Sequence, residues 1–189
     1  MKKYFVIVVS GLFLFFGCSS FSDKHLNFRK ININNVDVLT GNYSIFAIKA
    51  PKEAYPYFDN ANEKFYRKYG RGKSDTIKFD SIHGGNFKIL IKNAKEINLQ
   101  FEQNNKILKS QTLEYIIKDD GYLYIKNRNT IVKGIPYIFG GVDIRKVRIA
   151  LSENGDLIIN DIFASSGALL LIFGDAKVWE STNNYKRIK

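Results

Sequence analysis

Hydrophobic and polar residues alternate along most of the chain after residue 38. The clearest runs of alternating apolar residues are Phe87, Ile89 and Ile91, then Ile97, Leu99 and Phe101, and later Val147, Ile149 and Leu151. A period of two is typical of antiparallel strands with one buried face and one solvated face. Similar patterns predict strands at 38–48, 107–118, 121–128, 142–151, 156–163, 168–173 and 177–188, and a further strand around Ile77 and Phe79.

Residues with turn-forming side chains separate these segments. They lie at 83–86, 93–96, 104–105, 119–121 and 153–156. Asp-Gly and Asn-Gly pairs supply the positive φ angles that tight hairpins need. Turns between successive strands predict an up-and-down antiparallel meander, so the expected fold class is all-β. About eight to ten such strands protect their edges best when the sheet closes into a barrel or curls strongly.

One segment has helical periodicity instead. Ala61, Phe65 and Tyr69 fall on one face of a helix predicted near 59–69, and Asp59 is placed to cap its first turn. We expect this short helix to lie across one end of the sheet or barrel.

The N-terminal region differs from the rest of the chain. Two lysines are followed by an apolar run of about 14 residues that ends at Gly17, immediately before Cys18. A transmembrane helix needs about 20 residues, so residues 1–17 are typical of a cleaved export signal. Residues 18–37 are polar and lack clear periodicity, which predicts a flexible tether of on the order of 25 Å. The β domain would then cover residues 38–189.

The sequence Leu14-Phe15-Phe16-Gly17-Cys18 resembles the lipid-attachment motif of bacterial lipoproteins, with Phe15 at the usual leucine position. The resemblance implies that the Cys18 thiol receives a diacylglyceryl group and that cleavage follows Gly17. It also implies a membrane-anchored protein of the cell envelope, on its periplasmic or surface side. Two or more acyl chains hold a protein stably at a membrane, whereas one chain is marginal.

A second resemblance concerns the β domain. Gly41-Asn42-Tyr43 in the first strand and Arg187 in the last, with a meander between them, resemble the lipocalin-like (calycin) barrels. In that family a Gly-x-Trp on the first strand packs against a late arginine at the closed end of the barrel, and Tyr43 replaces the tryptophan here. The resemblance implies that Gly41, Tyr43 and Arg187 close the barrel. The overall plan also resembles uncharacterised small envelope lipoproteins of bacteria, which carries no known activity.

Composition excludes several classes of protein. One cysteine and two histidines are too few for a disulfide framework or a Cys/His zinc site, so we predict neither metal nor cofactor. The formal charge is +11, and loss of Lys2 and Lys3 with the signal leaves +9. We do not expect nucleic acid as a partner, because the protein is exported.

No residue combination in the sequence indicates catalysis, and we expect a protein that is not an enzyme. The segment 70–74 resembles the end of a phosphate-binding loop, but Arg67 stands where its first glycine is required. Asp119 and Asp120 are neighbours at a hairpin tip and would project to opposite faces. A carboxylate-based hydrolase is a weaker hypothesis, and it requires buried carboxylates that face a cleft.

The most distinctive local feature combines cations with aromatic rings between residues 64 and 73. Its candidate contacts for a ligand or anion are Lys64, Tyr66, Arg67, Lys68, Arg71 and Lys73. Such a segment is either a solvated helix face with inward aromatics or a grip for an anionic polymer or lipid headgroups.

Our main hypothesis is a non-enzymatic binding or scaffolding role, with a small apolar or amphiphilic ligand entering near the helix. The alternative is a module that binds an envelope protein or an anionic polymer through the basic segment 59–73.

Overall fold

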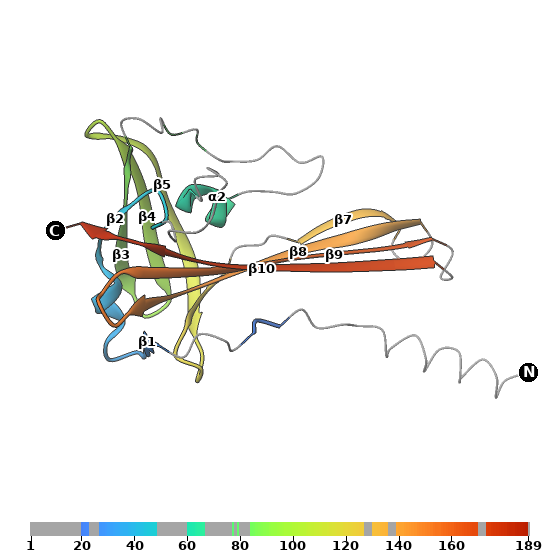
Figure 1. Ribbon diagram of the computed structural model, residues 1–189, viewed down its shortest axis with the longest axis horizontal. Coiled ribbons are helices and arrows are strands. Elements are labelled where there is room, and N and C mark those ends of the chain that lie inside the picture. The colour runs from blue at the N-terminus through green and yellow to red at the C-terminus, as the bar shows by residue number, and fades with distance from the viewer. Residues whose placement is uncertain are drawn as a thin grey trace, which may run out of the picture.

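The computed structural model describes residues 20–22, 27–48, 60–66, 77, 79, 84–126, 130–135, 139–169 and 173–188. Antiparallel strands dominate these residues, so the expected all-β class is confirmed (Figure 1). The strands are β1 (Phe28–Arg29), β2 (Gly41–Ser44), β3 (Asn86–Asn93), β4 (Glu96–Gln103), β5 (Lys106–Ile117), β6 (Leu123–Lys126), β7 (Thr130–Ile135), β8 (Phe139–Ser152), β9 (Leu157–Leu169), β10 (Phe173–Tyr185) and β11 (Arg187–Ile188). A 3₁₀-helix, η2 (Val36–Leu39), and a short α-helix, α2 (Ala61–Tyr66), accompany them.

The strands form one sheet with the order β10-β9-β8-β6-β5-β4-β3-β2-β11. Most neighbours in this order follow one another along the chain, as the meander predicted. Strand β8 has the most pairing partners in the sheet. On one side β9 pairs with almost its whole length. On its other side β8 pairs successively with β7, β6 and β1.

The turn chemistry read from the sequence is present at the hairpins. Asn104 and Asn105, between β4 and β5, have positive φ angles of 52° and 60°. Gly121 and Gly155 have φ angles of 83° and 85° in the turns before β6 and β9. Positive φ at these positions lets adjacent strands reverse without splaying.

The alternating apolar residues fill one core. Buried side chains from β2 to β6 join those from β8 to β10, and segments before β2 and helix α2 add to the same cluster. Its aromatic centre includes Phe87 and Phe101, whose rings stack at 5.8 Å, and Phe65 of α2, which lies 6.4 Å and 6.5 Å from them. Strands from both halves of the sheet share this cluster, so the sheet curls around it.

Three long strands extend beyond the curled part. Figure 1 shows β8, β9 and β10 continuing together away from the core, with β7 beside β8. We call this extension the arm and define it as β7 with residues 139–146, 162–169 and 173–180. Gly140 and Gly141 permit close packing here, since a Cβ atom would lie 2.0 Å from the Lys133 carbonyl oxygen and 2.3 Å from that of Ser166, respectively.

Several strand predictions need correction. The pattern at 168–173 was read as a separate strand, but its ends belong to β9 and β10, which are longer than their hydrophobic alternation indicated. Strand β7 was not predicted. Of the strand expected around Ile77 and Phe79, these two residues are described and lie outside any strand.

The predicted boundary between tether and domain at residue 38 is also wrong. Phe28 and Arg29 pair with Ser152 and Leu151 of β8, and Ile31 is buried in the core. The mostly polar sequence did not indicate this docking, because a few apolar residues suffice to attach a segment to an existing core. Cys18 and the signal lie outside the described residues.

The predicted helix is present at Ala61–Tyr66. The side chain of Asn60 accepts a hydrogen bond from the Asn62 N–H at 2.8 Å in the first turn, whereas Asp59, the predicted cap, lies outside the described residues. Ala61 and Phe65 are buried, as the helical face predicted. The remaining positions of the predicted helix lie outside the described residues.

The barrel expectation is not confirmed. The paired order begins at β10 and ends at β11, and the ladders between described strands do not return to their starting strand. The coarser alternative, an antiparallel sheet curled around its core, is what these strands form.

Candidate binding sites on the curled sheet and the arm

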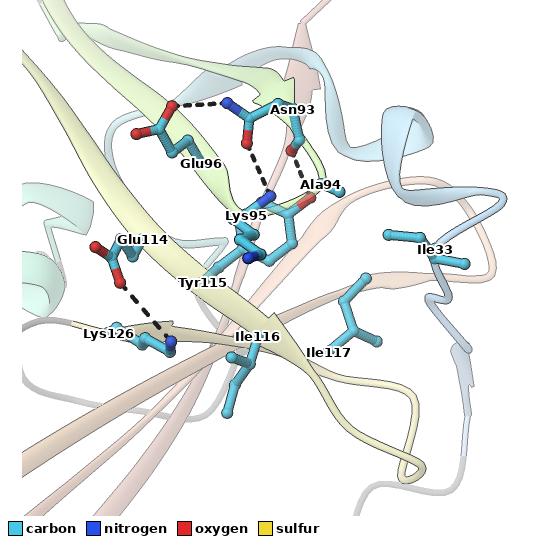
Figure 2. A pocket seen from close by; sticks show the side chains of 10 residues that line it. All are labelled: Ile33, Asn93, Ala94, Lys95, Glu96, Glu114, Tyr115, Ile116, Ile117 and Lys126. Atoms are coloured by element: carbon cyan, nitrogen blue, oxygen red, sulfur yellow. Dashed lines mark hydrogen bonds and ion pairs between the residues drawn. The ribbon is translucent and has the colours of Figure 1, made fainter.

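An open groove of about 750 Å³ lies beside the turn between β3 and β4 (Figure 2). It is lined by Ile33, Asn93, Ala94, Lys95, Glu96, Glu114, Tyr115, Ile116, Ile117 and Lys126. The turn comes from β3–β4, the facing wall from β5 and β6, and one edge from the segment before η2.

Hydrogen bonds fix the wall of this groove. The buried Tyr115 hydroxyl donates to the Asn93 carbonyl oxygen at 2.9 Å, and the Asn93 amide donates to the Glu96 carboxylate at 2.7 Å. Burial, with a smaller contribution from the Asp37 carboxylate, raises the pKa of Tyr115, which favours the neutral hydroxyl in this role. The groove therefore has a defined turn on one side.

The groove is amphiphilic. Ile33 is 58% exposed and Ile116 is 40% exposed. Negatively charged carboxylates and positively charged ammonium groups surround them. These include the exposed Glu114 carboxylate and the Lys126 ammonium, which lie 3.7 Å apart. An exposed pair at this distance contributes little to stability, so both groups are able to exchange partners with a ligand.

A second groove, of about 520 Å³, lies on the arm. The buried Asp143 lines this groove, accepts a hydrogen bond from Ser165 at 2.8 Å and pairs with Lys133. Trp179 stacks on Phe163 with ring centroids 5.4 Å apart and remains 53% exposed. The rest of the lining consists of Gly140, Gly141, Ser166, Gly167, Asp175 and Lys177.

A buried ionic cluster marks the point where the core ends and the arm begins. The Asp161 carboxylate on β9 lies 3.1 Å from the Lys64 ammonium of α2 and 2.9 Å from the Arg145 guanidinium of β8. Ser181 of β10 donates a hydrogen bond to the same carboxylate. The cluster therefore ties α2 to three strands.

The three residues expected to close the barrel lie together. Arg187 is paired with Tyr43 across β11 and β2, and its guanidinium donates hydrogen bonds to the carbonyl oxygens of Val38 and Thr40 at 3.2 and 2.5 Å. A Cβ on Gly41 would lie 2.8 Å from that guanidinium, so a larger residue would require the Arg187 side chain to shift. The three residues are thus neighbours, and their expected role in closing a barrel stays a prediction.

The Tyr43 hydroxyl is buried and donates to the Leu39 carbonyl oxygen at 2.8 Å. Burial raises the pKa of Tyr43 to about 12, with Arg187 acting in the opposite direction and Asp156 adding to the rise. The neutral phenol is thus the form that the fold accommodates.

Arg148 holds the N-terminal segment against the arm's base. Its guanidinium, on a side chain only 1% exposed, donates to Asn160 at 3.0 Å and to the Ser22 carbonyl oxygen at 2.9 Å. It also lies 4.3 Å over the Phe21 ring. Burial of Glu180 opposes its ionisation, but hydrogen bonds from Ser22 and Asn160 outweigh that effect and lower its pKa.

The proposed contacts of the basic segment do not form one exposed patch in the described residues. Lys64 is buried in the ionic cluster, and Tyr66 is buried with the Lys109 ammonium 3.6 Å over its ring. Their assignment as free ligand contacts is therefore corrected. The other four candidates, Arg67, Lys68, Arg71 and Lys73, lie outside the described residues.

Sequence reasoning missed Arg145, Arg148 and Asp161. Arg145 and Asp161 continue the buried faces of Val147 and Ile159 along β8 and β9, and charged residues on a buried face are expected to need partners. Arg148 lies on the opposite face of β8, where alternation predicts solvent, so the sequence held no comparable signal for it. Which partners they find depends on the pairing of distant strands, and this pairing could not be read from one strand at a time.

Comparison with known proteins returned no matching family model, curated protein or solved structure. Across the described ranges, no helix has the length and apolar character needed to cross a membrane. In the same part of the chain, no group of three or more histidine, cysteine, aspartate or glutamate side chains is arranged to hold a metal ion.

Substitution of Asp161 by asparagine should destabilise the fold strongly, because it removes the carboxylate that Lys64 and Arg145 share. Breaking a buried pair from one side typically costs about 3–5 kcal/mol. The free energy of unfolding in urea measures this, with Glu114→Gln in an exposed pair as the control and an expected change of about 0–1 kcal/mol. Equal effects of the two substitutions would contradict the role of the cluster.

The stabilising contribution of neutral Tyr43 should be complete below pH 10 and decline as pH rises toward 12. Its folded pKa of about 12 lies two units above the unfolded value of 10, so the loss approaches about 2.7 kcal/mol. Unfolding free energies of the native chain and Tyr43→Phe, compared from pH 8 to 11.5, should converge above pH 10. A difference that stays constant with pH would show that Tyr43 is not buried as a neutral phenol.

Proposed function

We propose that the protein is an envelope lipoprotein, anchored through lipid on Cys18, that serves a binding or scaffolding role without catalysing a reaction. The observation that supports a binding role is the amphiphilic groove open at the surface. Among the described residues the interior offers no comparable space, because the protein's own aromatic rings fill it. The lipid anchor is supported by the signal sequence that ends at Cys18.

A binding site inside the curled sheet is disfavoured by its packing. The rings of Phe65, Phe87 and Phe101 lie within 5.8 to 6.5 Å of one another, which is the normal spacing of a packed aromatic core. Ligand entry beside the helix would have to displace Phe65, which is 1% exposed. The surface groove is therefore the better place for a ligand.

The groove beside the β3–β4 turn suits an amphiphilic ligand. Apolar groups would contact Ile33, Ile116 and Ile117, and charged or polar groups would meet the carboxylates and lysines at its edges. Its volume lies within the range of sites for small molecules or short peptide segments. A short amphiphilic segment of an envelope protein and a free amphiphile share this chemistry.

The calycin-like closure is also part of the proposal. Strands β10 and β11, which stand at opposite ends of the sheet order, are separated by Lys186 alone. In addition, the N–H of Ile48 donates to the Asn184 carbonyl oxygen at 2.7 Å. These contacts support closure by the last segment of the chain, which would pair with β9 first and with β2 afterwards.

The hydrolase alternative rests on Asp143, a buried carboxylate that lines the arm groove. Asp143 pairs with Lys133 and accepts a hydrogen bond from Ser165. Such pairing indicates a structural role for Asp143, and Asp175, the other carboxylate that lines the groove, is exposed and lies 3.3 Å from the Lys177 ammonium. Binding is thus the function that the geometry favours.

Replacement of Cys18 by alanine should release the protein from the membrane, because the thiol is the proposed site of acylation. Fractionation of cells followed by immunodetection measures the share of protein that sediments with membranes. Ser20→Ala, two residues later, should keep the membrane association. Unchanged sedimentation and unchanged electrophoretic mobility of the Cys18→Ala chain would rule out lipidation there.

Substitution of Ile116 by glutamate should abolish most binding of an environment-sensitive apolar dye, because it places a charge in the apolar part of the groove. Dye fluorescence would be titrated with purified protein in the Cys18→Ala background. Ile107→Glu is a matched control, since Ile107 lies on the same strand, is 53% exposed and does not line the groove. Equal dye binding by both variants would exclude the groove.

A further inference from the structure

The two faces of the arm differ in charge. Cross-strand register assigns Asp143, Arg145, Asp175 and Lys177 to one face, here called the inner face, together with Lys133 and Trp179. The opposite face, here called the outer face, continues from Arg148 and Lys146 toward the tip. Because side chains alternate along a strand, these assignments follow from the pairing itself.

Among the described strand residues beyond the row of Lys146, Ile162 and Glu180, no position of the outer face is charged. Its next three rows are Thr130, Ile144, Ala164 and Val178, then Val132, Val142, Ser166 and Ala176, then Gly134, Gly140, Ala168 and Gly174. Val132 and Val178 are each 58% exposed. A neutral face of small and aliphatic residues with two exposed valines is suited to contact with an apolar environment.

The N-terminal segment is fixed on the outer face. The Ser22 hydroxyl donates to the Glu180 carboxylate at 2.7 Å, its carbonyl oxygen accepts from Arg148, and Phe21 packs edge-on against Tyr124 at 5.6 Å. Both Arg148 and Glu180 belong to the outer face. The chain that leads back to Cys18 thus leaves the protein on the same side as the uncharged rows.

The distance from Ser22 to the lipid attachment site is short. Ser22 stands four positions after Cys18, and an extended chain over four positions spans at most about 14 Å. A lipid-bearing Cys18 therefore holds the outer face close to the bilayer surface, whereas a free tether of residues 18–37 would have allowed a wide gap.

We propose that the outer face of the arm rests on the lipid bilayer in which Cys18 is anchored. This inference depends on the proposed lipid anchor. The neutral rows avoid the cost of desolvating charges at the bilayer, and the charged inner face remains in water. A second copy of the chain is a less favoured occupant, because the docked N-terminal segment directs this particular face toward the membrane.

The test uses the lipidated full chain with one introduced cysteine. Cys18 is the only native cysteine and its thiol is blocked by the lipid, so a thiol-reactive fluorophore labels the new site alone. Val178→Cys and Val132→Cys report on the outer face. Lys177→Cys is the matched control, since it neighbours Val178 on the same strand but belongs to the inner face, and Ile107→Cys reports on the curled part.

Each labelled protein would be reconstituted into phosphatidylethanolamine–phosphatidylglycerol vesicles with or without brominated acyl chains. We expect several-fold stronger quenching at positions 178 and 132 than at 177 and 107. Trp179, the only tryptophan and an inner-face residue, should be quenched as weakly as the label at 177.

Vesicle flotation separates failure of the inference from failure of the anchor. Protein that does not float with the vesicles would overturn both the lipid anchor and the bilayer contact. Floating protein with equal quenching at positions 178 and 177 would overturn the bilayer contact alone. Crosslinking between copies through position 178, without quenching by brominated lipid, would also overturn it and assign the face to a second copy.

Discussion

Pairing of the Asp161 carboxylate with Lys64 and Arg145 is the interaction on which the arrangement of the molecule depends. Strands β8, β9 and β10 run from the apolar core into the arm, and a polar group must be satisfied at the point where they leave the core. Asp161 is placed there, in register with Val147 and Ser181. Its two cations come from α2 and β8, so a single carboxylate connects the helix to the sheet at the base of the arm.

The same three strands explain why the arm has two unlike faces. Continuous register from the core to the tip means that each inward position of the core continues as the inner face of the arm. Apolar residues at these positions give way to Arg145 and Asp143, whereas the outer positions change from Arg148 to Ile144 and Val142. The polarity of the two faces is therefore reversed between core and arm, which leaves an uncharged surface next to the docked N-terminal segment.

Alternation of apolar residues was enough to predict the fold class, the central hairpins and the core of β3, β4 and β8, because these strands have one clearly buried face. It did not predict β7 or the full length of β9 and β10, since glycine and serine in the arm break the pattern without breaking the strands. The trio of Gly41, Tyr43 and Arg187 was found through a family resemblance. The roles of Lys64 and Arg148 depend on partners more than 90 residues away, which a local pattern does not contain.

Docking of the N-terminal segment changes what a lipid anchor at Cys18 would mean for the protein. A free tether would let the domain sample many orientations above the bilayer, so that no surface would be selected for contact with lipid. Hydrogen bonds from Ser22 to Glu180, and from Arg148 to Ser22, remove most of that freedom. With the outer face directed at lipid, the groove around Asp143 and Trp179 faces the aqueous side. The arm would then separate a lipid-facing surface from a surface available to partners in solution.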